Sequence, residues 1–394
     1  TGVDDRLIRA NAAFASGDTA TLVELLDADL RDCEASQGGG VSPAGGCRAA
    51  GGGGLSDRLA ARALAAGLQE DVNQSVRLLL KAADMRDADE AERVSLMLTA
   101  GSASALMGIG DGLVAVAGRI RSEAEAVLAR KPSDARWRRA AWVAQLWLGL
   151  VAADRRDYSA ARAAFMSALD HAPALSTLST RDRRVMWFSH YSLASLRQMT
   201  DKAEAQKHLV QALRLSREMT ERRAQWPAAW LMRALSGLLA VSDNPFSALS
   251  AQEASHLQDA LRALDRMASL GGDSTVALET RLMVLMRLHI GSLKRFDEAQ
   301  ARRSLSRDIA AVMAELQRRG DGAATGEAQA LTRAFKRYEA EVMRLTGETA
   351  KALDLLSEAL EGAQAPGAGL DQLEVLGIHA SIAQTSMQAG QADR

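Results

Sequence analysis

The residues that most often perform chemistry in proteins are scattered through this sequence. Its six histidines stand at positions 171, 190, 208, 256, 289 and 379. None belongs to an HExxH segment or has a cysteine or second histidine at the spacing of a metal site, and no serine lies in a GxSxG turn. The carboxylates stand beside arginine and lysine, as on solvated helix faces. We therefore expect no catalytic residue, no metal site, no cofactor and no enzyme activity within these 394 residues.

The two cysteines, Cys33 and Cys47, enclose a glycine-rich segment that continues to residue 54. A disulfide between them would close this segment and would indicate an oxidising compartment, periplasmic or otherwise extracytoplasmic. Two free thiols would instead indicate the cytoplasm. The segment is not a phosphate-binding loop, because it ends without a Gly-Lys-Ser or Gly-Lys-Thr sequence and no strand precedes it.

Composition narrows the class of protein further. The formal net charge is −1, so nothing in the overall charge favours binding to nucleic acid or to an anionic membrane. No run of 18 apolar residues is present, so no membrane span is expected. Aromatic residues make up only 4% of the chain and there are six prolines, a composition typical of helices rather than strands.

Residues 142–173 form the clearest structural pattern in the chain. Two helical segments flank a turn at Asp157-Tyr158, and Pro173 ends the second segment. Gly149 on the first segment and Ala161 on the second are small, so the two helices can approach closely. Phe165 is four residues after Ala161 and lies on the same face, where it fills the groove between the helices.

This pattern resembles one unit of the tetratricopeptide repeat, a helix–turn–helix of about 34 residues that stacks into solenoids. Gln145 and Ala152 depart from the family, which prefers tryptophan and tyrosine there. Eight positions carry the resemblance: Leu148, Gly149, Asp157, Tyr158, Ala161, Phe165, Ala168 and Pro173.

A longer repeat follows this unit. Ala161 corresponds to Ala205, which lies 44 residues later, and Leu209 and Ala212 follow Ala205 as Phe165 and Ala168 follow Ala161. The spacing from Ala141-Trp142 to Gly149 recurs from Ala229-Trp230 to Gly237. The repeat here is therefore longer than the family standard, through longer helices or longer loops.

We expect an all-α fold, a right-handed superhelical solenoid of about eight tetratricopeptide-like helical hairpins. Residues 1–32 form a degenerate hairpin, 33–54 a flexible glycine-rich loop, 55–132 a helical region with weak repeat character, and 133–394 the repeats. The last repeat shows a first helix without its second, so the natural chain is expected to continue past Arg394.

The resemblance implies a non-catalytic scaffold that binds another protein or a peptide. The alternative is a regulatory or sensor region of a larger signalling protein or protease whose catalytic domain lies elsewhere. All six tryptophans fall between residues 137 and 230, where they either fill the interior between helices or line a binding groove. By the register of the family, the groove positions would be Trp187, His190, Arg197 and Gln198 in the second unit. The matching positions of the first unit are Val143, Leu146, Leu150, Ala153 and Asp154.

Overall fold

The computed structural model describes residues 9, 13, 18–38, 55–69, 71–85, 89–106, 110–173, 178–196, 201–241, 248–294, 299–320, 326–364 and 372–390. Within these ranges every regular element is an α-helix, and sixteen helices are present. The chain divides into two compact units, Thr1–Ala205 and Gln206–Arg394. The prediction of an all-α fold is therefore confirmed.

The first unit contains the helices α2 (Thr19–Gly38), α3 (Leu55–Leu68), α4 (Val72–Ala83), α5 (Glu90–Leu106), α6 (Asp111–Leu128), α7 (Ala135–Asp154), α8 (Tyr158–His171) and α9 (Thr180–Ser195). Helix α10 (Lys202–Arg222) begins in the first unit and ends in the second. The second unit continues with α11 (Pro227–Leu239), α12 (Ala251–Ser269), α13 (Thr275–Lys294), α14 (Ala299–Gly320), α15 (Gly326–Thr346), α16 (Thr349–Gln364) and α17 (Gln372–Gln388).

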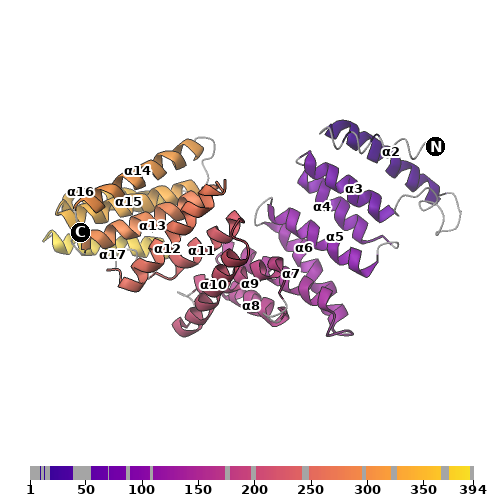
Figure 1. Cartoon of the computed structure of the whole chain (residues 1–394), viewed down its shortest axis with the longest axis horizontal. Helices are drawn as coiled ribbons and strands as arrows, with labels where there is room; N and C mark the ends of the chain where they lie inside the picture. Colours follow the sequence, from indigo (N-terminus) through magenta and orange to yellow (C-terminus); the bar gives the residue numbers. More distant parts are fainter. Residues whose placement is uncertain are drawn as a thin grey trace. The chain divides into compact units, whose positions relative to one another are not determined.

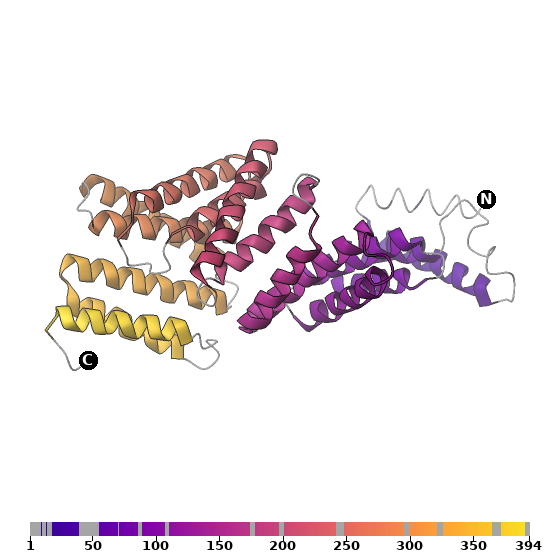
Figure 2. The same cartoon turned by 90° about the horizontal axis from the view of Figure 1, so that it is seen from below.

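Each unit is a row of helical hairpins in which neighbours along the chain are neighbours in space. Helices adjacent in sequence pack together, as α3 does with α4, α7 with α8, and α15 with α16 (Figure 1). Some odd-numbered helices also touch: α5 with α7, α11 with α13, and α13 with α15. Contacts of this kind, between first helices of successive hairpins, define a helical-repeat solenoid. Figure 2 shows the same rows seen from below. The handedness of the superhelix stays a prediction.

Side-chain links between successive hairpins join equivalent helices. Between second helices, Arg119 of α6 pairs with Asp84 at the end of α4, and Arg162 of α8 pairs with Glu204 of α10 at 2.8 Å. Between first helices, the indole N–H of Trp137 on α7 donates to Glu90 of α5 at 2.9 Å. Each link joins residues 35 to 47 positions apart, close to one repeat.

The hairpin expected at residues 142–173 is present as α7 and α8. Asp157 caps α8, because its side chain accepts the backbone N–H of Ala160. Ala161 and Phe165 are buried, and the Phe165 ring lies directly over Gly149. The close helix approach predicted from these small residues is therefore confirmed.

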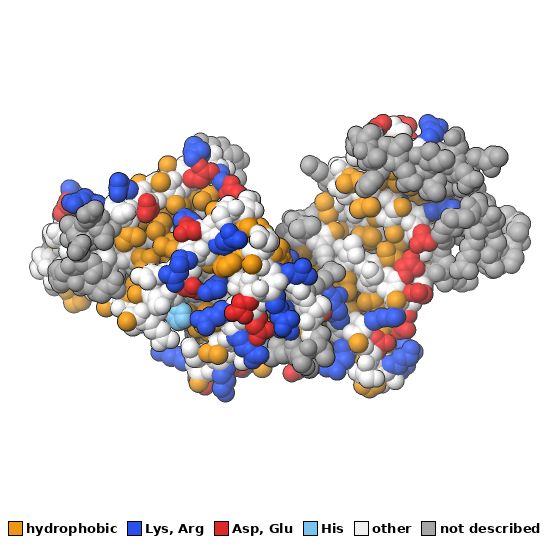
Figure 3. Space-filling model, viewed as in Figure 1, with side chains coloured by type: hydrophobic (Ala, Val, Ile, Leu, Met, Phe, Trp, Pro, Cys, Tyr) orange, Lys and Arg blue, Asp and Glu red, His pale blue; other side chains and the backbone are white. Residues whose placement is uncertain are grey.

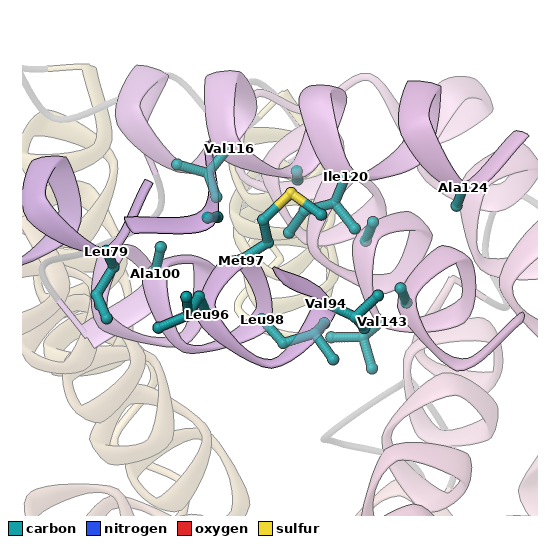
Figure 4. Packing of buried hydrophobic residues seen from close by; sticks show 14 of the residues in the cluster. Leu79, Val94, Leu96, Met97, Leu98, Ala100, Val116, Ile120, Ala124 and Val143 are labelled. Carbon is teal, nitrogen blue, oxygen red and sulfur yellow. The ribbon is translucent and has the colours of Figure 1, made fainter. Parts of the chain in front are cut away.

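The main core of the first unit extends from α3 to α7. Met97 of α5 is fully buried and points toward Ile120 of α6 (Figure 4). One helical turn further along α5, Gly101 leaves room for the ring of Trp147 from α7. Helix α7 is thus covered by neighbours over most of its circumference, which explains why three of its tryptophans, Trp137, Trp142 and Trp147, are buried.

The second unit is held by a buried polar network as well as apolar contacts. The Nδ1 atom of His289 on α13 lies 2.6 Å from the hydroxyl of Tyr338 on α15, and its Nε2 atom lies 3.2 Å from the hydroxyl of Ser306 on α14. Burial raises the pKa of Tyr338, and the negative charge of Glu339 raises it further. The phenol is therefore protonated near neutral pH. The network fixes the three helices against one another.

The glycine-rich segment differs from its expected bounds. Helix α2 continues to Gly38, so residues 33–38 are helical rather than part of a loop. Asp18, whose side chain accepts the N–H of Thr21, begins this helix, and the apolar residues after it extend it into the first glycines. Cys33 therefore belongs to α2, whereas Cys47 lies outside the described residues, so the disulfide stays a prediction.

Candidate functional site

Helix α9 carries two of the four residues expected to contact a partner, Trp187 and His190. Trp187 is only 2% exposed, so the prediction that it is partly open to solvent is wrong. His190, on the same helix, is half-buried. Arg197 and Gln198 lie outside the described residues. The interior alternative for the tryptophans is therefore correct for Trp187.

The burial of Trp187 follows from the face that α9 turns toward α7 and α8. Met186, Leu193 and Ala194 are buried on that side, and Leu193 belongs to a cluster with Phe165 of α8. Trp187 lies seven residues, two helical turns, before the buried Ala194, so it shares this inward face. A helix turns by about 100° for each residue, so the next residue, Phe188, lies at the edge of this face and is half-buried against the Phe165 cluster.

The outward face of α9 is aromatic with a cation at one end. Arg184 is exposed and Phe188 and Tyr191 are half-buried, at spacings of four and three residues that align them on one side of a helix. The Tyr191 ring stacks on Trp187 at 4.9 Å between centroids, and Phe188 meets Trp187 edge-on at 5.8 Å. We call Arg184, Phe188 and Tyr191 the aromatic face of α9. The buried ring of Trp187 packs against both aromatic rings of this face.

The neighbouring helix α7 extends this surface. Leu150 and Ala153 are partly exposed and pack in the same cluster as Phe188, and Asp154 is exposed at the end of α7. The other two positions expected to line a groove here, Val143 and Leu146, are buried. Three of the five α7 positions predicted to line a groove, Leu150, Ala153 and Asp154, therefore reach the surface. The residues at the surface of α9 differ from those predicted.

Polar contacts hold α9 in this orientation. Ser179 caps the helix by accepting the N–H of Asp182, and Arg139 of α7 binds the Asp182 carboxylate at 2.7 Å. The indole N–H of Trp142 on α7 reaches the hydroxyl of Ser189 at 3.4 Å. Burial raises the pKa of Asp182, but the hydrogen bonds from Ser179 and Arg139 outweigh it, so the net pKa lies below its usual range.

This shift predicts an acid-sensitive contribution to stability. Because the pKa of Asp182 is depressed in the folded chain, its stabilisation is complete above the unfolded pKa of about 3.9 and is lost as pH falls through the lower folded value. We expect Asp182→Asn to be less stable than the wild type at pH 7, and the difference to shrink as the pH falls below the unfolded pKa and through the lower folded one. Urea unfolding at several pH values measures this. A difference that stays constant with pH would contradict it.

A second exposed surface lies on α3. Leu64 and Leu68 are exposed one helical turn apart, and Ala61 continues the same side. Figure 3 shows hydrophobic side chains over this part of the first unit. The surface has no neighbouring exposed aromatic residue or arginine on α3, so it is less specific than the aromatic face of α9.

The sequence contains a signal that sets where α9 begins and which of its residues share a face. Ser179 followed three residues later by Asp182 is a helix-start pattern, and it sets where α9 begins. Counting from that start places Arg184, Phe188 and Tyr191 on one face. The helix start does not say whether this face or the adjacent one with Trp187 is buried, because both carry aromatic residues.

Other kinds of site are not supported by the side chains described. None of the helices seen is long and apolar enough to span a membrane. No three histidine, cysteine, aspartate or glutamate side chains among the placed residues gather as metal ligands.

Of three comparisons with known proteins, only the comparison with solved structures found a match. No protein-family model matches the chain. No curated protein matches it in sequence either. Among solved structures, the chain is similar to yeast Tom70, with a TM-score of 0.36 and 10% identity over 98% of this chain and 81% of that one.

Proposed function

We propose that this chain is a scaffold that binds a segment of another protein through the aromatic face of α9. The observation that carries the proposal is the alignment of Arg184, Phe188 and Tyr191 on one side of a helix, above a buried tryptophan. Arginine and aromatic side chains are the types most enriched at the energetic centres of protein interfaces.

The support from Trp187 favours tight binding. A tyrosine stacked on a fixed indole has already lost much of its rotational freedom, so less entropy is lost when a partner arrives. The partly exposed Leu150 and Ala153 of α7 continue the surface with apolar area. Rings, apolar area and one exposed cation suit a helix or extended peptide with apolar residues and a carboxylate that pairs with Arg184.

Selection of peptides against the folded chain tests this proposal. A random peptide library displayed on phage should yield apolar sequences that contain aspartate or glutamate. Affinity of the selected peptides is then measured by fluorescence anisotropy with wild type and variants. We expect Phe188→Ala and Arg184→Ala each to weaken binding by about tenfold or more, as for central interface residues.

Two matched variants separate the site from general effects. Arg136→Ala removes another exposed arginine of the first unit, and Leu64→Ala shortens an exposed leucine of α3; both should bind as the wild type does. Because Phe188 is partly buried, Arg184→Glu provides a variant that leaves the interior untouched, and it should reject the acidic peptides. If peptides bind all these variants equally, the aromatic face is not the site.

A further inference from the structure

Helix α17 presents an apolar face that no described part of the chain covers. Leu376 is 63% exposed and Met387 is 70% exposed, and the exposed Ala380 and Ala383 lie between them. The spacings of four, three and four residues place all four on one side of the helix. We call these four residues the α17 stripe. The opposite side is buried, where Ile378 packs against Ala359 and Ala363 of α16.

The α17 stripe is nearly free of charge. From Val375 to Gly390 the only ionisable side chain is His379, which is exposed. A solvated helix in this chain usually carries arginine and glutamate on its open side, as α10 does with Arg214 and Glu218. An apolar and uncharged open face is typical of an interface. It also contains no charge that would repel an identical face.

The exposed positions are symmetric along the helix. About the midpoint between Ser381 and Ile382, Leu376 mirrors Met387 and Ala380 mirrors Ala383. Of the exposed polar residues, His379 mirrors Gln384, whereas Gln388 mirrors the partly buried Val375. An antiparallel pair of α17 helices would therefore place each large apolar residue opposite the other large one, with alanines at the centre that allow close approach.

We propose that a second copy of this chain occupies the α17 stripe, with the two α17 helices packed antiparallel about a two-fold axis. Such an interface is isologous, so each contact occurs twice. Leu376 of one subunit packs on Met387 of the partner subunit, and His379 meets Gln384 of the partner subunit across the rim. The interface is one helix wide, so the dimer dissociates on dilution.

Sedimentation of the 394-residue chain over a range of concentrations tests the proposal. The wild-type mass should rise toward twice that of one chain. Leu376→Glu and Met387→Lys, made singly, should each weaken self-association by about tenfold or more, because each buries two unpaired charges. Both residues are exposed, so circular dichroism should show unchanged folding. Leu64→Glu on α3 is the matched control and should dimerise normally.

The paired variants establish the antiparallel arrangement. Leu376→Glu combined with Met387→Lys should restore the dimer, because each introduced carboxylate faces an introduced ammonium group of the other subunit. Leu376→Glu combined with Met387→Glu should stay dissociated. A chain that is monomeric at every concentration overturns the proposal, as does a dimer that Leu376→Glu leaves intact or a failure of the opposite-charge pair to restore association.

Discussion

Replacing Trp142 with alanine is expected to lower the free energy of unfolding by about 3–5 kcal/mol. Trp142 lies in α7 and is completely buried, at 0% exposure. Truncation removes the largest side chain type from a close-packed site, and the surrounding helices cannot fully close the cavity. It also leaves the hydroxyl of Ser189 on α9 without the indole N–H that now reaches it.

Urea unfolding followed by circular dichroism measures this loss, with Trp226→Ala as the matched control. Trp226 is the residue that precedes α11 and it is partly exposed, so its removal creates less cavity and should cost less. Hydrogen exchange should show the greatest acceleration in α7 and α9, because each hairpin is stabilised by its neighbours. Equal losses for the two variants would contradict the assignment of Trp142 to the interior.

Replacing Gly149 with alanine is expected to destabilise the protein by about 1–3 kcal/mol, although alanine normally favours a helix over glycine. A Cβ atom at this position would lie 2.5 Å from the Phe165 ring of α8. Phe165 is itself buried, so the ring has little room to move away. The steric cost therefore exceeds the gain in helix propensity, which is about 1 kcal/mol.

Gly118 of α6 is the matched control, because a Cβ atom there meets nothing within 4 Å. Gly118→Ala should raise the unfolding free energy by about 0.5–1 kcal/mol. A Phe165→Leu change should recover part of the loss caused by Gly149→Ala, which a double-mutant cycle measures as a coupling energy. If both glycine variants are stabilised alike, α7 and α8 do not approach as closely as described.

Contacts within one hairpin could be predicted from the sequence, because they join residues a few helical turns apart. The spacing from Gly149 to Ala161 and Phe165 specifies which faces of α7 and α8 meet, and all three lie as expected. The second unit has a similar local arrangement, in which Gly347 follows α15 with a φ of 91° and Leu356 of α16 is buried. Helical periodicity alone decides such contacts.

Which face of α9 points outward could be decided only from the tertiary structure. Its sequence has an aromatic residue at Trp187, Phe188 and Tyr191, so more than one face of the helix is apolar. Which face becomes interior depends on how Leu193 meets α8 and how Asp182 meets Arg139 of α7. Periodicity could not choose between adjacent aromatic positions, so the candidate site moved by one residue.

The composition and spacing of this sequence determined its class, an all-α chain of helical hairpins, because helix formation and hairpin packing depend on residues close in sequence. Links between hairpins were decided only in three dimensions, since the partners lie about one repeat apart and nothing local marks them. Trp137 with Glu90 and His289 with Tyr338 are two such pairs. The exposure of the α17 stripe was also decided only by the tertiary structure. An apolar helix face is buried or exposed according to whether another element packs against it.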